Sequence, residues 1–357
     1  MKSLRRNYSE KLKNPKNMTR KRFTPLYLYI KDFIWHIYYN LVYPSNNKVF
    51  IKSDIKNPIR KILMIPDPQI FVDTGSVKTL CLNYKKYLER KNYAVEILVD
   101  TNLTKVAKIA NSKEYDFVHF HNPLQLRVIK GKMKRDFCIT NHRMKEILRN
   151  DNNLAPSIIA LNGNEKDFYI KNGFKGVIGV VPNGVEREKF SFTPKGNGKA
   201  ICMVRPLDGK GEDHLFNNLN DKVKIDFVGM DEIGRLKKLG LCNVLGKWSR
   251  EEVHQRLTEY SCLVLNSKME SSSLTVMEAL SAGLSLVVSK EAFANLDKKD
   301  FIEVVPVGMG DESLAKMINL QIENNDKYRE EIREYSERFD FGNTLGRYID
   351  FIEKSIK

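Results

Sequence analysis

Two glutamates near the C-terminus carry the strongest chemical signal of the chain. Glu270 and Glu278 stand eight positions apart, and the residues from Leu274 onward predict a helix of small and apolar side chains. The first amides of a helix lack intrahelical acceptors and favour anions. A phosphate and a sugar of one ligand can therefore lie on these amides, with one carboxylate at the sugar and the other further along the ligand. The apolar runs 262–265 and 284–288 on either side favour this interpretation over two glutamates on a solvated helix.

Two cations form a second candidate group. Arg205 directly follows the predicted strand 199–204, and Lys210 comes five positions later between two glycines. Open parallel sheets bind ligands at the carboxyl ends of their strands, and an arginine and a lysine on one such loop can neutralise a diphosphate. The alternative is a solvated loop in a lysine-rich protein.

Three histidines lie near the ends of two predicted strands. His142 follows the run 137–141, and its imidazole could donate to a sugar hydroxyl or carbonyl or could simply lie at the surface. His119 and His121 share one face of the preceding strand, but no third ligand is nearby, so we expect no metal here. The chain has no Asp-x-Asp pair to bridge a divalent metal and a nucleotide. Lysine and arginine must then carry the phosphate charge.

The elements that must position these residues form two successive series. Strand-like runs alternate with helical patterns from residue 61 to 181, and the alternation restarts at 199 and runs to 305. Such alternation predicts α/β domains with parallel sheets covered on both faces. The turn Val181-Pro-Asn-Gly-Val185 separates the two series and is expected to act as a hinge. A helical tail is predicted from residue 313 to the end, broken near residues 341–342.

Composition and charge limit the classes of function that this chain can have. The 357 residues are 42% hydrophobic and 29% charged, which is typical of a globular protein of two domains. The five cysteines are expected to be small buried side chains. Residues 1–22 hold nine lysines and arginines against one acid, so this tail supplies half of the net charge of +16. Because the charge is concentrated there and no aromatic–basic platform is apparent, no nucleic acid is expected as a partner.

An aromatic run, residues 23–43, follows the basic tail. Charged residues interrupt it, so a spanning helix is not expected. Two interpretations stay open: a helix lying on an anionic membrane surface, and a helix that docks on the protein's own first domain. No signal peptide is visible, and a cytoplasmic location, peripheral on the membrane in the first case, is expected.

In chain order, these segments resemble the GT-B glycosyltransferases, and specifically the retaining glycosyltransferase family 4. The matching pieces are the hinge turn 181–185, the Arg205…Lys210-Gly loop, the strand ends Phe227-Val-Gly229 and Val244-Leu-Gly-Lys247, and Glu270-x7-Glu278. The resemblance implies two Rossmann-like domains that face each other across a cleft. The expected divisions are an N-terminal extension of residues 1–46, an acceptor-side domain of 47–182, a nucleotide-sugar domain of 183–335, and a C-terminal helix of 336–357 that crosses back to the first domain.

The resemblance also implies an activity and its residues. It implies metal-independent transfer of a hexose, with retention, from a UDP- or GDP-linked sugar to a glycan or lipid-linked acceptor. The catalytic residues would be Glu270, His142, Arg205 and Lys210. The donor-binding residues would be Gly75, Arg205, Lys210, Gly229, Lys247, Glu270, Ser273, Leu274, Thr275 and Glu278. Ser273 stands where the family usually has glycine, and Gly75 alone represents the usual glycine pair of the first loop.

Three alternatives share the same architecture. A nucleotide-sugar epimerase would form product without an acceptor, and a phosphorylase would depend on phosphate. A non-catalytic protein of the same fold is disfavoured by the presence of both cations and both glutamates.

Overall fold

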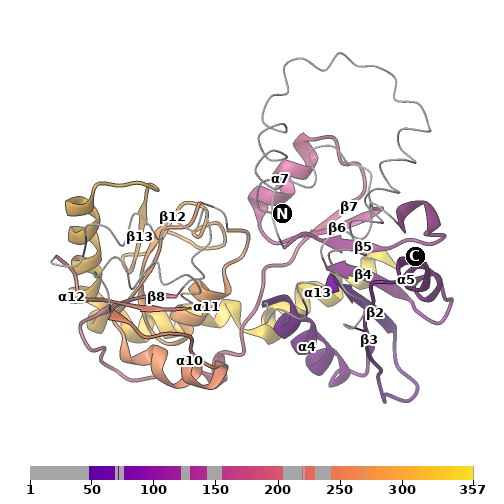
Figure 1. Cartoon of the computed structure of the whole chain (residues 1–357), viewed down its shortest axis with the longest axis horizontal. Coiled ribbons are helices and arrows are strands. Elements are labelled where there is room, and N and C mark those ends of the chain that lie inside the picture. The colour runs from indigo at the N-terminus through magenta and orange to yellow at the C-terminus, as the bar shows by residue number, and fades with distance from the viewer. Residues whose placement is uncertain are drawn as a thin grey trace, which may run out of the picture. The chain divides into compact units, whose positions relative to one another are not determined.

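The structure is a computed structural model of the chain. It describes residues 48–68, 71, 76–121, 129–142, 155–203, 219, 222–229, 243–268 and 270–356. The predictions for Gly75, Arg205, Lys210, the helical run 232–239 and the extension 1–46 lie outside these residues. Residues 45–357 form one compact unit, which holds both predicted sheets (Figure 1).

The first sheet has seven strands in the order β1-β3-β2-β4-β5-β6-β7. All neighbours are parallel except the edge strand β1, which pairs antiparallel with β3. The strands are β1 (Val49–Ile51), β2 (Lys61–Pro66), β3 (Ala94–Val99), β4 (Phe117–His121), β5 (Cys138–Thr140), β6 (Ser157–Ala160) and β7 (Val177–Val180). The strands from β2 to β7 agree with the predicted runs, whereas β1 was not predicted because three half-exposed residues leave no periodic pattern.

Helices and turns connect these strands. They are α4 (Ser76–Glu89), α5 (Leu103–Ala110), the 3₁₀ turn η2 (Lys130–Lys132) and α7 (Gly163–Lys171). The helical run predicted from 77 to 91 corresponds to α4. Asn102 and Asn162 cap α5 and α7 by accepting from the third backbone amide of each helix. Neither helix was predicted, and α7 buries only two side chains, Glu165 and Tyr169, so it has almost no apolar stripe.

The second sheet has six parallel strands in the order β10-β9-β8-β11-β12-β13. They are β8 (Ala200–Met203), β9 (Ile225–Val228), β10 (Asn243–Val244), β11 (Cys262–Leu265), β12 (Ser285–Ser289) and β13 (Ile302–Val305). The connections include η3 (Arg187–Lys189), α10 (Arg250–Arg256), η4 (Leu257–Glu259) and α11 (Leu274–Ser281). Two parallel sheets with helical connections confirm the predicted α/β fold class.

The C-terminal helices divide between the two sheets. α12 (Asp311–Tyr335) packs on β12 and β11 of the second sheet, and η5 (Ser336–Phe339) leads into α13 (Phe341–Ser355). α13, yellow in Figure 1, lies beside α4, and its Tyr348 belongs to the same buried core as Ile62 of the first sheet. The break between the helices lies at 336–340, slightly before the predicted position, and Asp340 caps α13 through Gly342 N–H (2.8 Å).

The hinge turn and the start of α13 are bonded to each other. Val185 N–H donates to the carbonyl of Phe339 (3.0 Å), and Phe341 N–H donates to the carbonyl of Val185 (2.8 Å). A Cβ on Gly184 would come within 2.2 Å of Thr344 Oγ1, so only glycine permits this close crossing.

One sequence expectation concerns the burial of the cysteines. Cys81, Cys138, Cys202 and Cys262 are buried, as expected, while Cys242 lies outside the described residues. Among the helices of the described ranges, none has both the length and the apolar character needed to cross a membrane.

Candidate functional site

The loop that carries Glu270 joins β11 to α11, and side chains from two other segments hold it. Asn162, two residues after the end of β6, donates from Nδ2 to the carbonyl of Ser271 (2.5 Å). Asn183, in the hinge turn, donates from Nδ2 to the carbonyl of Ser272 (2.8 Å), and its backbone N–H donates to Ser272 Oγ (2.9 Å). All these contacts are half-buried or buried. The loop is therefore fixed both to the first sheet and to the hinge.

The start of α11 offers backbone donors. Ser273 occupies the N-cap position, and no side-chain capping bond from it is present in the described part of the chain. The amides of Leu274 and Thr275 belong to the first helical turn, where an α-helix has no internal acceptors for them. The side chains of these two residues are half-buried. This end of α11 has the local geometry that stabilises an anion.

Glu278 has a partner that sequence reasoning missed. Its carboxylate is buried and accepts from Arg250, at 2.6 Å from the guanidinium Nη1. Burial raises the pKa of Glu278, and the nearby arginine opposes that shift only in part. Arg250 also contacts His254 Nε2 (3.3 Å). The missed signal is the position of Arg250 in the first turn of α10, where the helix dipole disfavours a cation unless an acid compensates it.

Gly229 and Lys247 lie at the ends of neighbouring strands. Gly229 N–H donates to the carbonyl of Gly246 (3.0 Å), and Leu245 N–H donates to the carbonyl of Phe227 (2.8 Å), so the parallel pairing of β9 and β10 continues past their ends. Lys247 is exposed. Both residues thus lie at the carboxyl edge of the second sheet, where open sheets bind ligands.

The three histidines of the first sheet form one cluster through a hydrogen bond and ring contacts. His121 Nδ1 lies 3.1 Å from His142 Nε2, and the two rings stack with centroids 5.4 Å apart. The His119 ring lies 4.0 Å from that of His121, and its nitrogens contact Tyr348 Oη (2.9 Å) and Thr140 Oγ1 (2.8 Å). Tyr348 belongs to α13, so the cluster also ties the last helix to the strand ends.

Burial keeps this cluster uncharged at neutral pH. It lowers the pKa of His142 to about 4 and that of His119 to about 3, and it depresses the pKa of His121 strongly as well. In the described ranges, no group of three or more histidine, cysteine or acidic side chains has an arrangement that could hold a metal ion. His142 is half-buried, so a neutral imidazole reaches the surface at the end of β5.

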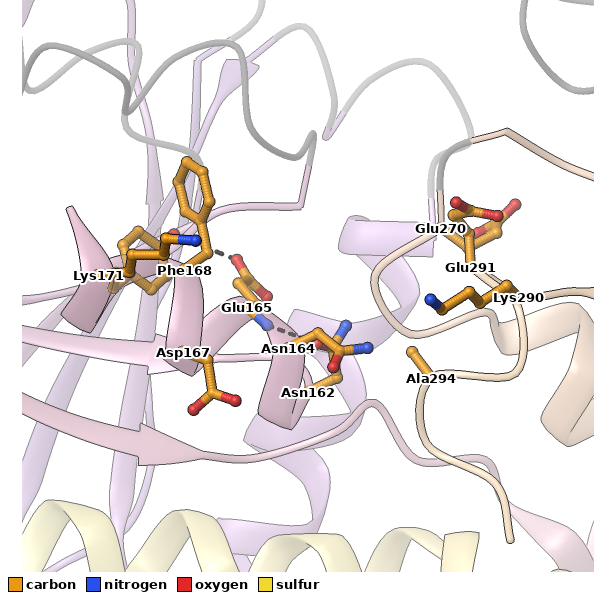
Figure 2. A pocket seen from close by; sticks show the side chains of 11 residues that line it. Asn162, Asn164, Glu165, Asp167, Phe168, Lys171, Glu270, Lys290, Glu291 and Ala294 are labelled. Carbon is orange, nitrogen blue, oxygen red and sulfur yellow. Dashed lines mark hydrogen bonds between the residues drawn. The ribbon is translucent and has the colours of Figure 1, made fainter. Parts of the chain in front are cut away.

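Glu270 lines a cavity of about 430 Å³ together with residues of α7 (Figure 2). One wall consists of α7 and the residue that caps it, and the other consists of the Glu270 loop and the segment after β12. The lining residues are Asn162, Asn164, Glu165, Asp167, Phe168, Tyr169, Lys171, Glu270, Lys290, Glu291 and Ala294. Glu278 instead lines a second, much smaller cavity with Arg250, His254, Leu274, Asn83, Thr79, Leu80, Gly184, Val185 and Glu186.

The structure thus brings some of the predicted residues together. Glu270, Ser273, Leu274, Thr275 and Glu278 share one loop and helix, although the two carboxylates open into different cavities. His142 lies in the histidine cluster of the first sheet. The amides that fix the loop, Asn162 and Asn183, were not predicted as site residues.

Comparisons with known proteins agree with this arrangement. Residues 186–339 match the family described as glycosyl transferases group 1, and this segment contains the second sheet and the Glu270 loop. Among solved structures, a glycosyltransferase from Rickettsia africae is similar, with a TM-score of 0.69 and 16% identity over 85% of this chain and all of that one.

Two further solved structures have the same fold. HepE of Anabaena, crystallised with UDP and glucose, has a TM-score of 0.66 and 17% identity over 83% of this chain and all of HepE. Sucrose-phosphate synthase of Thermosynechococcus elongatus has a TM-score of 0.67 and 13% identity over 83% of this chain and 99% of the synthase.

A curated protein of a different class also aligns. The beta subunit of DNA-directed RNA polymerase from Neospora caninum is 27% identical over 234 residues, which are 62% of this chain and 21% of that subunit. The chain spans about a fifth of the length of that relative. An alignment of this extent does not assign polymerase activity to the chain. Residues 186–339 therefore match the glycosyl transferases group 1, and the chain has the GT-B fold of the structurally similar glycosyltransferases.

Proposed function

We propose that the protein is a retaining glycosyltransferase that moves a hexose from a nucleotide-diphosphate sugar to a glycan or lipid-linked acceptor. The observation that carries this proposal is the anchored Glu270 loop, which leads into the open N-terminus of α11 within the segment that matches glycosyl transferases group 1. The loop is held by polar contacts from the first sheet and the hinge, so its geometry is set before a ligand binds. Such preorganisation is what transition-state stabilisation requires.

We infer that the donor is a UDP-sugar. HepE, which has the same fold, was crystallised with UDP and glucose, and this favours UDP over GDP. Arg205 and Lys210 would neutralise the diphosphate, and the amides of Ser273 and Leu274 would bind the distal phosphate. Gly75 would approach the donor from the acceptor-side domain, residues 47–182. Gly229 and Lys247 at the strand ends would border the base.

Glu278 would bind the ribose, and its pairing with Arg250 gives that role a physical basis. A lone carboxylate in a buried position tends to become protonated, because burial raises its pKa. Arg250 stabilises the charged form, which accepts hydrogen bonds from two hydroxyls.

Catalysis would rest on electrostatic support of the departing diphosphate. In a retaining reaction without metal, Arg205 and Lys210 would stabilise the charge that develops on the leaving group, and Glu270 would hold the hydroxyls of the transferred sugar. His142 is neutral at pH 7 because burial lowers its pKa to about 4. We therefore assign to it a hydrogen bond with the sugar or acceptor and no role as a charged acid.

A donor screen tests the proposal. The full chain is incubated with UDP- and GDP-linked hexoses in EDTA, and thermal shift and slow donor hydrolysis are measured. We expect one UDP-sugar to raise the melting temperature and to be hydrolysed. We expect hydrolysis to fall roughly a hundredfold in Arg205→Ala, which corresponds to about 3 kcal/mol of lost stabilisation.

The same screen separates the rival activities. An epimerised nucleotide sugar formed without acceptor would assign the chain to the epimerases, and sugar phosphate formed only in the presence of phosphate would assign it to the phosphorylases. Failure of every nucleotide sugar to bind would exclude the proposed function.

A further inference from the structure

The cavity between α7 and the Glu270 loop is large enough for a small molecule and is built from fixed side chains. Its volume of about 430 Å³ falls in the range of small-molecule sites. The α7 wall is held from within. Asn162 Oδ1 accepts from Glu165 N–H (2.7 Å), and Glu165 accepts from Leu161 N–H (2.8 Å) and Tyr169 Oη (3.1 Å). The wall thus keeps its shape without a ligand.

The opposite wall is tied to the first by two amides. Asn162 donates to the carbonyl of Ser271 beside Glu270, and Asn295 donates to the carbonyl of Leu161 (3.1 Å). In Figure 2 the side chains of α7 lie on one side, and those of Glu270, Lys290 and Glu291 lie on the other. A ligand in the cavity would therefore contact α7, which belongs to the first sheet, and the Glu270 loop, which belongs to the second sheet.

The charge of the cavity disfavours an anion. Four carboxyl side chains and two lysines line it, so acids outnumber bases. Burial raises the pKa of Glu165 to about 7, and even with Glu165 protonated three carboxylates face two ammonium groups. A nucleotide diphosphate would be repelled here. The donor phosphates therefore belong elsewhere, and this cavity is separate from them.

The remaining surface suits a ring with many hydroxyls. Asn164, Asp167 and Lys171 are exposed polar side chains on α7, and Phe168 adds a half-exposed aromatic ring among them. Amide and carboxylate groups hydrogen-bond hydroxyls, and an aromatic ring covers the apolar face of a sugar. Glu270, which the proposed function places at the transferred sugar, opens into the same cavity.

We propose that this cavity binds a neutral sugar ring of the acceptor, next to the transferred sugar at Glu270. The inference rests on the proposed glycosyl transfer. It names the acceptor class as an uncharged glycan end and assigns Asp167 and Phe168 to its recognition. The reaction would place the acceptor hydroxyl at the edge of the cavity where Glu270 lies.

Direct sugar binding tests this proposal without turnover. Saturation-transfer-difference NMR is recorded on the full chain with the methyl glycosides of glucose, galactose, mannose and N-acetylglucosamine, each with and without UDP. We expect at least one glycoside to give a signal that persists with saturating UDP. We expect the signal to fall at least fivefold in Asp167→Asn and in Phe168→Ala.

Matched substitutions on exposed residues away from the cavity serve as controls. Asp350→Asn on α13 and Phe50→Ala on β1 should leave the signal unchanged. Binding by none of the glycosides, displacement by UDP, or equal signals in the cavity variants would each overturn the inference. Loss of UDP binding with an intact sugar signal would instead contradict the proposed donor, so the two failures are distinguishable.

Discussion

The candidate site residues of the second sheet are mostly charged, whereas those described on the first sheet are uncharged. On the second sheet, the loop from β11 to α11 presents Glu270, a helix start and the Arg250–Glu278 ion pair. On the first sheet, the strand ends carry three histidines that burial keeps neutral. The amides at the helix start of the second sheet suit a phosphate, whereas the uncharged imidazoles of the first sheet can offer only neutral hydrogen bonds. The difference in charge between the two sheets thus follows from desolvation as much as from residue type.

The largest expected effect on catalysis comes from removing the hydrogen bonds that join the Glu270 loop to the first sheet and to the hinge turn. Asn183→Ala removes the side-chain hydrogen bond to the carbonyl of Ser272 and keeps the bond from its backbone N–H, and Asn162→Ala removes the bond to Ser271. Because a small displacement of Glu270 is costly for catalysis, we expect donor hydrolysis to fall about a hundredfold in each variant. Unfolding free energy should fall by only about 1–2 kcal/mol. Hydrolysis at the wild-type rate would show that the loop does not depend on the first sheet.

A smaller effect is expected from the surface histidine of the first sheet. His142→Ala should lower the transfer rate about tenfold, since it removes one neutral hydrogen bond worth about 1–1.5 kcal/mol. His142→Asn should recover part of the rate because its amide is also uncharged and hydrogen-bonding. Transfer is measured with the acceptor that the glycoside experiment identifies. Equal rates for Ala and Asn would contradict a hydrogen-bonding role.

The stability of the first sheet should depend on pH in a defined direction. The unfolded imidazole has a pKa near 6.5, while the folded pKa of His142 is about 4. The unfolded state therefore binds more protons between these values, and stability is lost as pH falls from 6.5 to 4. We expect His142→Gln to reduce this slope by up to about 1.4 kcal/mol per pH unit in urea titrations.

The second sheet provides the control for that slope. His254 is half-buried beside Arg250, and burial together with nearby cations lowers its pKa. Because its depression is less extreme, His254→Gln should change the slope less than His142→Gln does. A larger change at His254 would reverse the proposed contrast between the sheets.

The smallest expected effect concerns the basic extension, residues 1–46. If it binds an anionic membrane, the full chain should float with liposomes that contain phosphatidylserine. A chain that begins at residue 47 should be recovered with them in a smaller fraction. Donor hydrolysis in solution should be equal for both chains. Equal recovery would favour a helix that docks on the protein itself.

Much of the fold was predictable because apolar runs of four to six residues identify buried parallel strands. Those runs placed both sheets and the helix at Leu274. β1 and α7 were missed for a physical reason: one is a short edge strand, and the other has no apolar stripe. α5 was missed although its buried residues follow a helical pattern, because it is only two turns long.

The site was predictable only as far as local patterns reach. The Glu270–Glu278 spacing identified the loop and helix, yet the contacts that fix them join residues about 90 to 110 positions apart, as Asn183 and Asn162 do. The Arg250–Glu278 pair likewise depends on how α10 packs beside α11. No periodicity encodes such contacts, because they arise from the topology of the sheets.

Calorimetric titration of UDP tests the central claim most directly. The full chain and Arg205→Ala are titrated in excess EDTA and then with Mg²⁺. We expect UDP to bind the wild type without metal, with a Kd that Mg²⁺ leaves unchanged, and to bind Arg205→Ala roughly a hundredfold more weakly, because the variant loses a charge-assisted contact with the diphosphate. Binding that requires Mg²⁺, or an equal Kd in the variant, would contradict the central claim.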